Sequence, residues 1–156
     1  MARLRMAVVG VGHLGKEHAR ILAGLPDVEL VGVADLHAEQ AQTVATNCQT
    51  RAYTSHAPLL NLVDAACIAV PTRHHFAVAS DFLRRGIPLL VEKPLAATLE
   101  QAQALVELAR AAGAVLQVGH IERFNPAFEE LQRVPLQPKF VECQRIGPFT
   151  GRSTDI

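Results

Sequence analysis

The sequence predicts an α/β fold in which helices cover both faces of a doubly wound parallel sheet. Short apolar runs alternate with amphipathic segments over short connections, a pattern typical of parallel sheets. One run, Ala65–Val70, is apolar throughout, as in a strand covered on both faces. The first run, Met6–Val9, leads into Gly10-Val11-Gly12-His13-Leu14-Gly15, so a G-x-G-x-x-G loop joins a predicted strand to a predicted helix.

The glycine loop is predicted to bind a dinucleotide. Gly10 allows a tight turn, Gly12 removes the side chain that would block the pyrophosphate, and Gly15 lets the helix approach the strand. The start of the helix offers free N–H groups and a partial positive charge to the phosphates. A second strand-like run, Val28–Ala34, ends at Asp35, about twenty residues after Gly15, where a ribose-binding carboxylate is expected. The alternative is a glycine turn that holds no ligand.

Asp35 also predicts which dinucleotide binds. Its carboxylate can accept hydrogen bonds from both hydroxyls of the adenosine ribose, whereas it would repel a 2′-phosphate. The next residues, Leu36 and His37, include no arginine to offset that repulsion. We therefore expect NAD as the cofactor, with NADP less favoured.

The remaining elements of this region follow in order. After the helix that follows the glycine loop, helical segments are expected at Ala38–Cys48, His56–Leu62, His75–Arg85 and Thr98–Ala112. Further strands are expected at Arg51–Tyr53, Pro88–Val91 and Val115–Val118.

Two helices carry predicted end signals. Thr72 is predicted to cap the helix at His75–Arg85, and Gly86 to end it. The helix at Thr98–Ala112 has Thr98 as its cap, Gln101 at the capping-box position and Gly113 as its stop.

The pattern changes after Gly119. Residues 1–119 are expected to form a dinucleotide-binding domain, and residues 120–156 a connecting helix and the truncated start of a second α/β domain. The helix is expected around Pro126–Arg133, and an alternating strand at Lys139–Ile146 would open the second domain. The last stretch, Gly147–Ile156, ends in mid-pattern.

Composition limits the classes of function. The chain has 156 residues, of which 49% are hydrophobic, and its formal net charge is 0 with no basic block. This argues against nucleic acid or an anionic membrane surface as a partner. No apolar run is long enough to span a membrane, and the N-terminus leads into a strand rather than a signal peptide. The three cysteines form no C-x-x-C motif, so we expect free thiols and a cytoplasmic location.

Glu92-Lys93-Pro94 directly follows the predicted strand at Pro88–Val91. Ligands of open α/β sheets lie beyond the carboxyl ends of the strands, so Lys93 is expected to point toward the nicotinamide end of the cleft. It can orient a substrate hydroxyl or, as a neutral amine, accept its proton. A solvated lysine at a loop edge is the alternative, and the glycine loop in the same chain favours the functional interpretation. We also expect a cis Lys93–Pro94 bond, which X–Pro bonds tolerate in tight functional turns.

Most histidines are assigned structural roles. His18 is expected to pack on the apolar face of the first helix, and His37 and His56 are expected at the surface. His74 and His75 are neighbours that point about 100° apart on a helix, which makes them a poor metal pair. No metal site is expected.

Together these motifs resemble those of the glucose–fructose oxidoreductase, inositol dehydrogenase and MocA family, over nearly the whole chain. The matching stretches are Gly10–Gly15 with His18, Asp35, Val70-Pro71-Thr72 with His75, Glu92-Lys93-Pro94, and Arg123-Phe124-Asn125-Pro126. The resemblance implies a Rossmann domain in which Lys93 is the catalytic lysine. It also implies the cofactor-binding residues Gly10, Gly12, His13, Leu14, Gly15, Asp35, Val70, Pro71, Thr72, His75, Glu92 and Lys93.

Two further stretches, Gln117–Pro126 and Gly151–Asp155, resemble the UDP-N-acetylglucosamine 3-dehydrogenases within that family. This implies hydride transfer from C3 of a nucleotide-sugar substrate to NAD, with substrate contacts from His120, Arg123 and Asn125. It also implies that the other catalytic residues lie in the incomplete domain, so that this chain alone would bind cofactor but have little or no activity. A homo-oligomer is expected for the full-length enzyme.

Two other functions are compatible with the same motifs. A non-catalytic module that senses NAD(H) needs the glycine loop and Asp35 but no lysine at the nicotinamide, so Lys93 argues against it. A different two-domain reductase, such as a biliverdin-type enzyme, shares the fold and is disfavoured only by the sub-family stretches.

Overall fold

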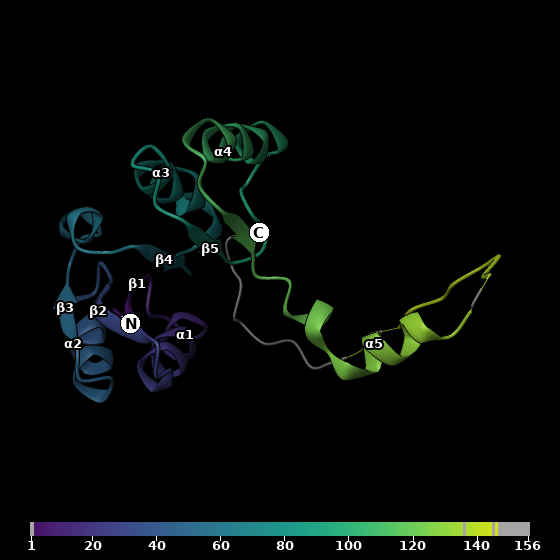
Figure 1. Ribbon diagram of the computed structural model, residues 1–156, viewed down its shortest axis with the longest axis horizontal. Coiled ribbons are helices and arrows are strands. Elements are labelled where there is room, and N and C mark those ends of the chain that lie inside the picture. Colours follow the sequence, from purple (N-terminus) through teal and green to yellow (C-terminus); the bar gives the residue numbers. More distant parts are fainter. Residues whose placement is uncertain (1, 136, 145, 147–156) are drawn as a thin grey trace. The chain divides into compact units, whose positions relative to one another are not determined.

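Six parallel strands form one sheet in the computed structural model, which describes residues 2–135, 137–144 and 146 (Figure 1). The strands are β1 (Leu4–Val9), β2 (Val28–Ala34), β3 (Arg51–Tyr53), β4 (Ala65–Ile68), β5 (Leu89–Val91) and β6 (Leu116–Val118). Their order in the sheet is β3-β2-β1-β4-β5-β6, and each neighbouring pair is parallel. The predicted doubly wound α/β fold is confirmed.

The strand order reverses between β1 and β4. From β1 the chain adds β2 and β3 toward one edge of the sheet, and from β4 it adds β5 and β6 toward the other. In such sheets the ligand crevice lies beyond the carboxyl ends of the strands at this switch point. The glycine loop leaves β1 there, so the topology places it at the crevice.

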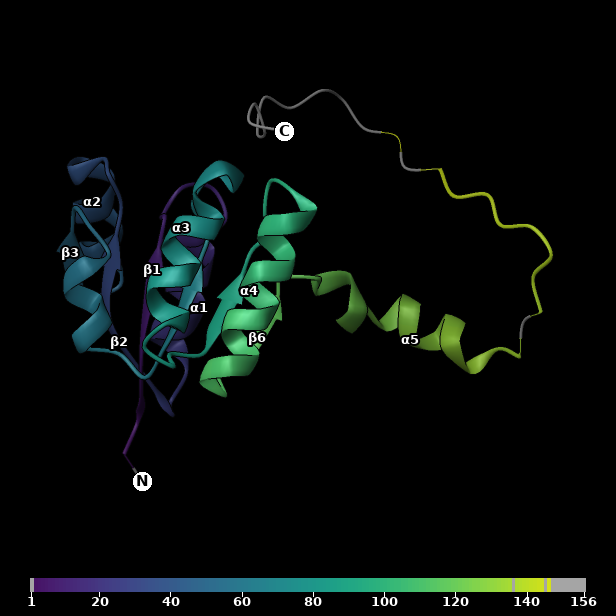
Figure 2. The ribbon, with the colours of Figure 1, turned by 90° about the horizontal axis from the view of Figure 1, so that it is seen from above.

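Helices cover both faces of the sheet. They are α1 (Gly15–Gly24), α2 (Ala38–Asn47), the 3₁₀ helix η1 (Ala57–Asn61), α3 (Thr72–Leu83) and α4 (Leu99–Ala112). Figure 1 shows α1 and α2 on one face and α3 and α4 on the other, and Figure 2 shows α3 and α4 in front of the strands.

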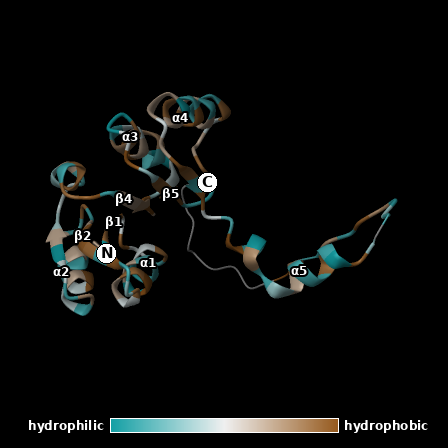
Figure 3. Ribbon diagram, viewed as in Figure 1, coloured by the Kyte–Doolittle hydropathy of each residue, from teal (hydrophilic) through white to brown (hydrophobic). Residues whose placement is uncertain are grey.

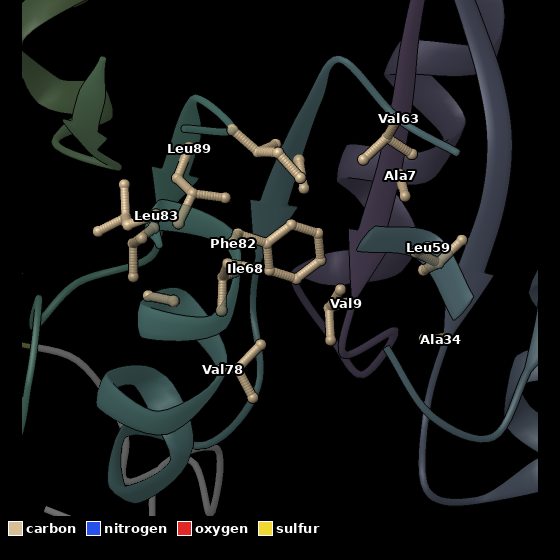
Figure 4. Close-up of a cluster of buried hydrophobic side chains, with 14 of the residues drawn as sticks. Ala7, Val9, Ala34, Leu59, Val63, Ile68, Val78, Phe82, Leu83 and Leu89 are labelled. Atoms are coloured by element: carbon tan, nitrogen blue, oxygen red, sulfur yellow. The ribbon is translucent and has the colours of Figure 1, made fainter. Parts of the chain in front are cut away.

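A hydrophobic cluster on each face joins helices to sheet. Successive strand residues point to opposite faces, so Val8 and Cys67 pack with α1 and α2, while Val9 and Ile68 pack with α3. In Figure 4, Phe82 of α3 points toward the strands that carry Val9 and Ile68. Figure 3 shows hydrophobic residues along β1 and β4. Each face of the sheet is therefore closed by its own helices.

The Thr98 cap and the Gly113 stop predicted for α4 are confirmed, whereas the Gln101 side chain does not complete a capping box, because its buried Oε1 has no hydrogen-bond partner among the described residues. The Thr98 hydroxyl accepts a hydrogen bond from the backbone N–H of Gln101 at 3.3 Å. Gly113 follows the last turn with a φ of 64°, in the left-handed region that favours glycine.

The cap predicted for α3 is wrong. The helix begins at Thr72 itself, and its N-cap residue is Pro71, which makes no side-chain capping hydrogen bond. Pro71 has an extended backbone, and its carbonyl accepts the N–H of His74 at 2.8 Å. The first turn therefore closes before the expected start at His75.

A second unit of the chain begins at His120. It contains the 3₁₀ helix η2 (Ile121–Phe124) and the predicted helix, α5 (Pro126–Arg133). The strand predicted at Lys139–Ile146 is wrong for residues 139–144 and 146, none of which is in a strand. A strand needs the N–H and C=O groups of a neighbour, and the described part of this unit contains no other strand. The prediction for Gly147–Ile156 lies outside the described residues. No described helix is long and apolar enough to cross a lipid bilayer.

Candidate active site

The glycine loop has two glycines that the protein's own packing requires and one that faces open space. Gly10 has a φ of +83°, and a Cβ there would lie 2.6 Å from the backbone nitrogen of Val70. A Cβ on Gly15 would lie 1.8 Å from the carbonyl oxygen of Gly10, so α1 begins directly against the loop. A Cβ on Gly12 would meet only the Gln40 amide nitrogen, at 3.9 Å. The loop thus leaves free the position where a phosphate is expected to approach.

The N-terminus of α1 adds favourable electrostatics to this position. Its N-cap residue, Leu14, makes no side-chain capping hydrogen bond. The first N–H groups of a helix lack partners within the helix and carry a partial positive charge. They are suited to an anionic group at the loop, in line with the role predicted for His13 and Leu14.

Asp35, at the end of β2, connects the predicted ribose site to the glycine loop. Its Oδ2 accepts hydrogen bonds from the Val11 N–H at 2.9 Å and from the Gln40 amide at 3.1 Å. Its Oδ1 accepts one from the His37 N–H at 2.9 Å and contacts the His37 ring at 3.1 Å. Burial opposes ionisation, but the hydrogen bonds from His37 and Val11 outweigh it and hold the pKa of Asp35 below its usual value. An ionised carboxylate therefore lies beside the loop.

The Asp35 contacts were only partly foreseen. The acid itself was predicted, but its bonds to Val11 and Gln40 were not. His37, expected at the surface, does have a side chain that is 83% exposed, yet its ring contacts the carboxylate. Gln40 lies in the first turn of α2, five residues after the acid, and the extended backbone at His37 between them means that no helical spacing in the sequence points to this contact.

Lys93 is the first exposed residue beyond the carboxyl end of β5, and the predicted cis Lys93–Pro94 bond is confirmed. The preceding residue, Glu92, is buried. Its Oε1 lies 2.8 Å from His18 Nε2, and its Oε2 accepts the Lys93 N–H at 3.2 Å. A Cβ on Gly119 would come within 3.1 Å of the same carboxyl group. The Glu92 carboxylate is thus enclosed by protein groups beside the lysine.

The sequence predicted that His18 only packs on the apolar face of the first helix, but its side chain has a further role. Its contact with Glu92 joins α1 to the turn after β5. His56 is likewise not simply a surface residue, because its Nε2 lies 2.9 Å from Asp81 and its ring lies against Phe82. Both predictions are corrected by contacts between elements that are distant in sequence.

His75 contacts two loops of the site, the one that follows β4 and the turn that contains Pro94. It is 1% exposed, with Nε2 at 2.8 Å from the Val70 carbonyl and Nδ1 at 2.9 Å from the Pro94 carbonyl. Val70 and Pro71 connect β4 to α3, where Thr72 is also buried. Both ring nitrogens of His75 are thus directed at protein carbonyls.

The residues predicted to contact substrate lie in the second unit. His120, Arg123 and Asn125 are exposed. The Asn125 side chain caps α5, accepting the Ala127 N–H at 3.0 Å, and donates to Glu122 at 2.8 Å. The structure describes these residues within their own unit.

Residues 4–120 match the family described as "Oxidoreductase family, NAD-binding Rossmann fold", of the glucose–fructose oxidoreductase, inositol dehydrogenase and MocA type. The chain belongs to this family, as the sequence predicted, and NAD is the family's cofactor.

Several members of the family are similar to this chain in sequence or in structure. The UDP-N-acetylglucosamine 3-dehydrogenase of Acidithiobacillus ferrooxidans is 41% identical over 157 residues, covering 100% of this chain and 50% of the relative. A solved structure of that enzyme superposes with a TM-score of 0.80 over 85% of this chain and 44% of its own, at 42% identity. A scyllo-inositol 2-dehydrogenase (NAD(+)) of Bacillus subtilis is 33% identical over 84% of this chain and 40% of its own.

One solved structure contains the cofactor. GenD2 from gentamicin A biosynthesis, in complex with NAD, has a TM-score of 0.82 at 31% identity over 85% of this chain and 39% of its own. This chain spans about half the length of the curated relatives it matches.

Proposed function

We propose that this chain is the cofactor-binding half of an NAD-dependent oxidoreductase that oxidises a sugar hydroxyl. The observation that carries the proposal is Lys93, exposed at the carboxyl end of β5 in the same unit as the glycine loop and Asp35. A fold that only bound NAD would need the loop and the acid but would have no use for this lysine. The non-catalytic sensing module is for that reason the weaker candidate.

The described residues fit NAD. The open space at Gly12 and the N-terminus of α1 suit the pyrophosphate. The ionised Asp35 suits the ribose hydroxyls and disfavours a 2′-phosphate. When bound, NAD supplies the acceptor for the hydride that leaves the substrate carbon.

Lys93 acts on the hydroxyl of that carbon. As an ammonium it donates a hydrogen bond that holds the hydroxyl oxygen, and as a neutral amine it accepts the proton released when the carbon is oxidised. A proton-transfer group of this kind contributes typically 10²- to 10⁴-fold to the rate. The chain's own contribution to the chemistry is therefore to hold the cofactor and to place this amine.

The substrate we propose is a nucleotide sugar, with C3 of a UDP-N-acetylhexosamine as the oxidised carbon. The support is the 41% identity to a UDP-N-acetylglucosamine 3-dehydrogenase. His120, Arg123 and Asn125 are the proposed substrate contacts from the second unit. We further propose that residues 1–119 form the cofactor domain, that residues 120–156 begin the domain that completes the site, and that the full-length enzyme is a homo-oligomer.

The test is Lys93→Ala in the full-length enzyme, with NAD and UDP-N-acetylglucosamine as substrates. We expect kcat to fall by about 10²-fold or more, while the Kd for NAD changes by less than about threefold. An interaction made mainly in the transition state lowers the rate without a matching loss of binding. Lys139→Ala, at an exposed lysine outside the proposed site, is the control. Near-normal turnover in Lys93→Ala would remove this residue from the mechanism.

A further inference from the structure

Two histidines hold the residues on either side of Lys93. His18 Nε2 contacts the side chain of Glu92, the residue before it, and His75 Nδ1 contacts the carbonyl of Pro94, the residue after it. His18 lies on α1 and His75 on α3, which pack on opposite faces of the sheet. The turn that carries the lysine is thus held from both faces.

The contact on the α1 side passes through a buried carboxylate. Glu92 Oε1 lies 2.8 Å from the His18 ring, and Oε2 accepts the backbone N–H of Lys93 at 3.2 Å. The absence of a side chain at Gly119 leaves the room that this carboxyl group occupies. A buried carboxylate is costly without hydrogen-bond donors, so Glu92 is confined to the position where it has both.

The contact on the α3 side is made directly to the backbone. His75 is buried, and its ring lies between the carbonyls of Val70 and Pro94 at 2.8 and 2.9 Å. A carbonyl oxygen can only accept, so each of these contacts is a hydrogen bond when the ring nitrogen that makes it carries a proton. The contact between Nδ1 and the Pro94 carbonyl is the one that holds the turn.

We propose that His18 and His75 are positioning residues that fix the backbone on both sides of Lys93 and thereby aim its amine at the substrate hydroxyl. The proposal rests on the function proposed for Lys93. His75, which the sequence predicted to bind the cofactor, is buried with both ring nitrogens at protein carbonyls, so we assign it this indirect role in place of a cofactor contact. Neither histidine has to touch substrate or cofactor for this role. Because a catalytic group misplaced by about 1 Å can lose on the order of 10²-fold in rate, the histidines act on kcat rather than on the affinity for NAD.

Amide side chains can test each contact separately. A glutamine amide nitrogen reaches about as far as Nε2 of histidine, and an asparagine amide nitrogen about as far as Nδ1. His18→Gln should keep the bond to Glu92, whereas His18→Asn should lose it. At the second position the order reverses, because His75→Asn should keep the bond to Pro94 and His75→Gln should lose it. A role in packing alone would not give opposite orders at the two positions.

The first measurement is turnover of the full-length enzyme with NAD and UDP-N-acetylglucosamine. For His18→Asn and His75→Gln, kcat should fall by about 10- to 100-fold. For His18→Gln and His75→Asn it should stay within about threefold of wild type, as should the KM for NAD in all four variants. His74→Gln, next to the second histidine, is the control. The same order at both positions, or equal activity in all four variants, would overturn the proposal.

The second measurement does not need turnover. The 156-residue chain has only three lysines, Lys16, Lys93 and Lys139, so ¹³C-methylated lysines give a simple spectrum in which Lys93→Arg identifies one signal. The Lys93 signal should have its own distinct chemical shift in wild type, His18→Gln and His75→Asn. In the other two variants its chemical shift should move toward that of the exposed Lys139, and an unchanged signal in all four would overturn the proposal.

The two measurements separate this proposal from the proposed function. Near-normal turnover in Lys93→Ala would reject the function of the lysine, whatever its spectrum shows. If Lys93 is essential for turnover, but neither its signal nor kcat changes in the histidine variants, only the positioning role is rejected. Thermal melts identify any variant that fails to fold, and the partly exposed His18 pair carries the test if the buried His75 pair does not fold.

Discussion

The ionised carboxylate of Asp35 should decide between NAD and NADP. We predict that the chain binds NAD at least about tenfold more tightly than NADP, a difference of about 1.4 kcal/mol. Asp35→Ala should narrow the difference because it removes the charge that repels the 2′-phosphate, whereas Asp27→Ala, at an exposed acid, should not. Calorimetric titration with both cofactors measures the effect. Equal or tighter binding of NADP to the wild type would refute it.

A second carboxyl group, that of Asp64, should make the free energy of unfolding depend on pH. Asp64, just before β4, accepts hydrogen bonds from the Arg5 guanidinium at 2.6 and 3.1 Å, and these lower the pKa of Asp64 from 3.8 to about 2. A carboxyl group whose pKa is lowered by folding stabilises the fold above its unfolded pKa and loses that effect as the pH falls through its folded pKa. The stability advantage of wild type over Asp64→Asn should therefore be complete above about pH 5 and disappear between about pH 4 and 2. Urea denaturation across this range measures it, and a constant difference would contradict the prediction.

For single residues, the sequence predicted those roles that depend on neighbouring positions in the chain. The glycine loop, Asp35 and the cis Lys93–Pro94 bond all belong to short motifs next to a strand end. The contact between His18 and Glu92 joins residues 74 positions apart, so no local sequence pattern predicts it. A lone histidine among apolar helix positions is usually a packed residue, so its partner became visible only once α1 and β5 were placed.

Among the elements, helix ends were predictable where a single residue controls them. Thr98 at the start of α4 and Gly113 after its end each set the helix boundary that the sequence predicted. At α3, Thr72 was the predicted cap, but Pro71 before it is the N-cap residue with ψ of 143°, so Thr72 is already the first residue of the helix. The strand expected at Lys139–Ile146 depended on alternation alone, and alternation does not supply the partner that a strand requires.

The Thr98 cap gives a testable contribution to stability. Thr98→Ala removes the oxygen that accepts the Gln101 N–H, and it should lower the free energy of unfolding by about 1 kcal/mol. Thr46→Ala, at an exposed position inside α2, is the matched control and should have a much smaller effect. Urea denaturation of both variants measures the difference. Equal effects would show that the cap adds nothing beyond helix propensity.

For the whole molecule, the cofactor unit should withstand protease better than the second unit. Both hydrophobic clusters lie within residues 2–119, whereas every described residue from His120 onward is exposed. Limited trypsin digestion of the 156-residue chain should therefore cut first between Val134 and Ile156 and leave residues 1–119 intact. Mass spectrometry identifies the products, and sedimentation establishes the oligomeric state. A resistant C-terminal segment in a monomeric sample would show that our domain boundary is misplaced.

The resistant product should still bind NAD, because the residues we assign to the pyrophosphate and the ribose all lie before Gly119. Titration of this product with NAD tests whether the cofactor site is independent of the residues that the protease removes. A loss of binding would show that residues beyond the cut belong to the cofactor site.

Because Asp35 already makes four contacts within the protein, we expect a bound ribose to exchange with some of its present hydrogen-bond partners. A carboxylate offers about four lone-pair positions, and those of Asp35 already face the Val11 N–H, the His37 N–H, the His37 ring and the Gln40 amide. The two backbone donors are fixed by the chain, so under the function we propose the ribose hydroxyls would take the places of the two side chains. The number of hydrogen bonds to the acid would then be the same before and after binding. On this proposal the carboxylate would contribute selectivity, by repelling a 2′-phosphate, and most of the affinity would come from the phosphates and the nicotinamide.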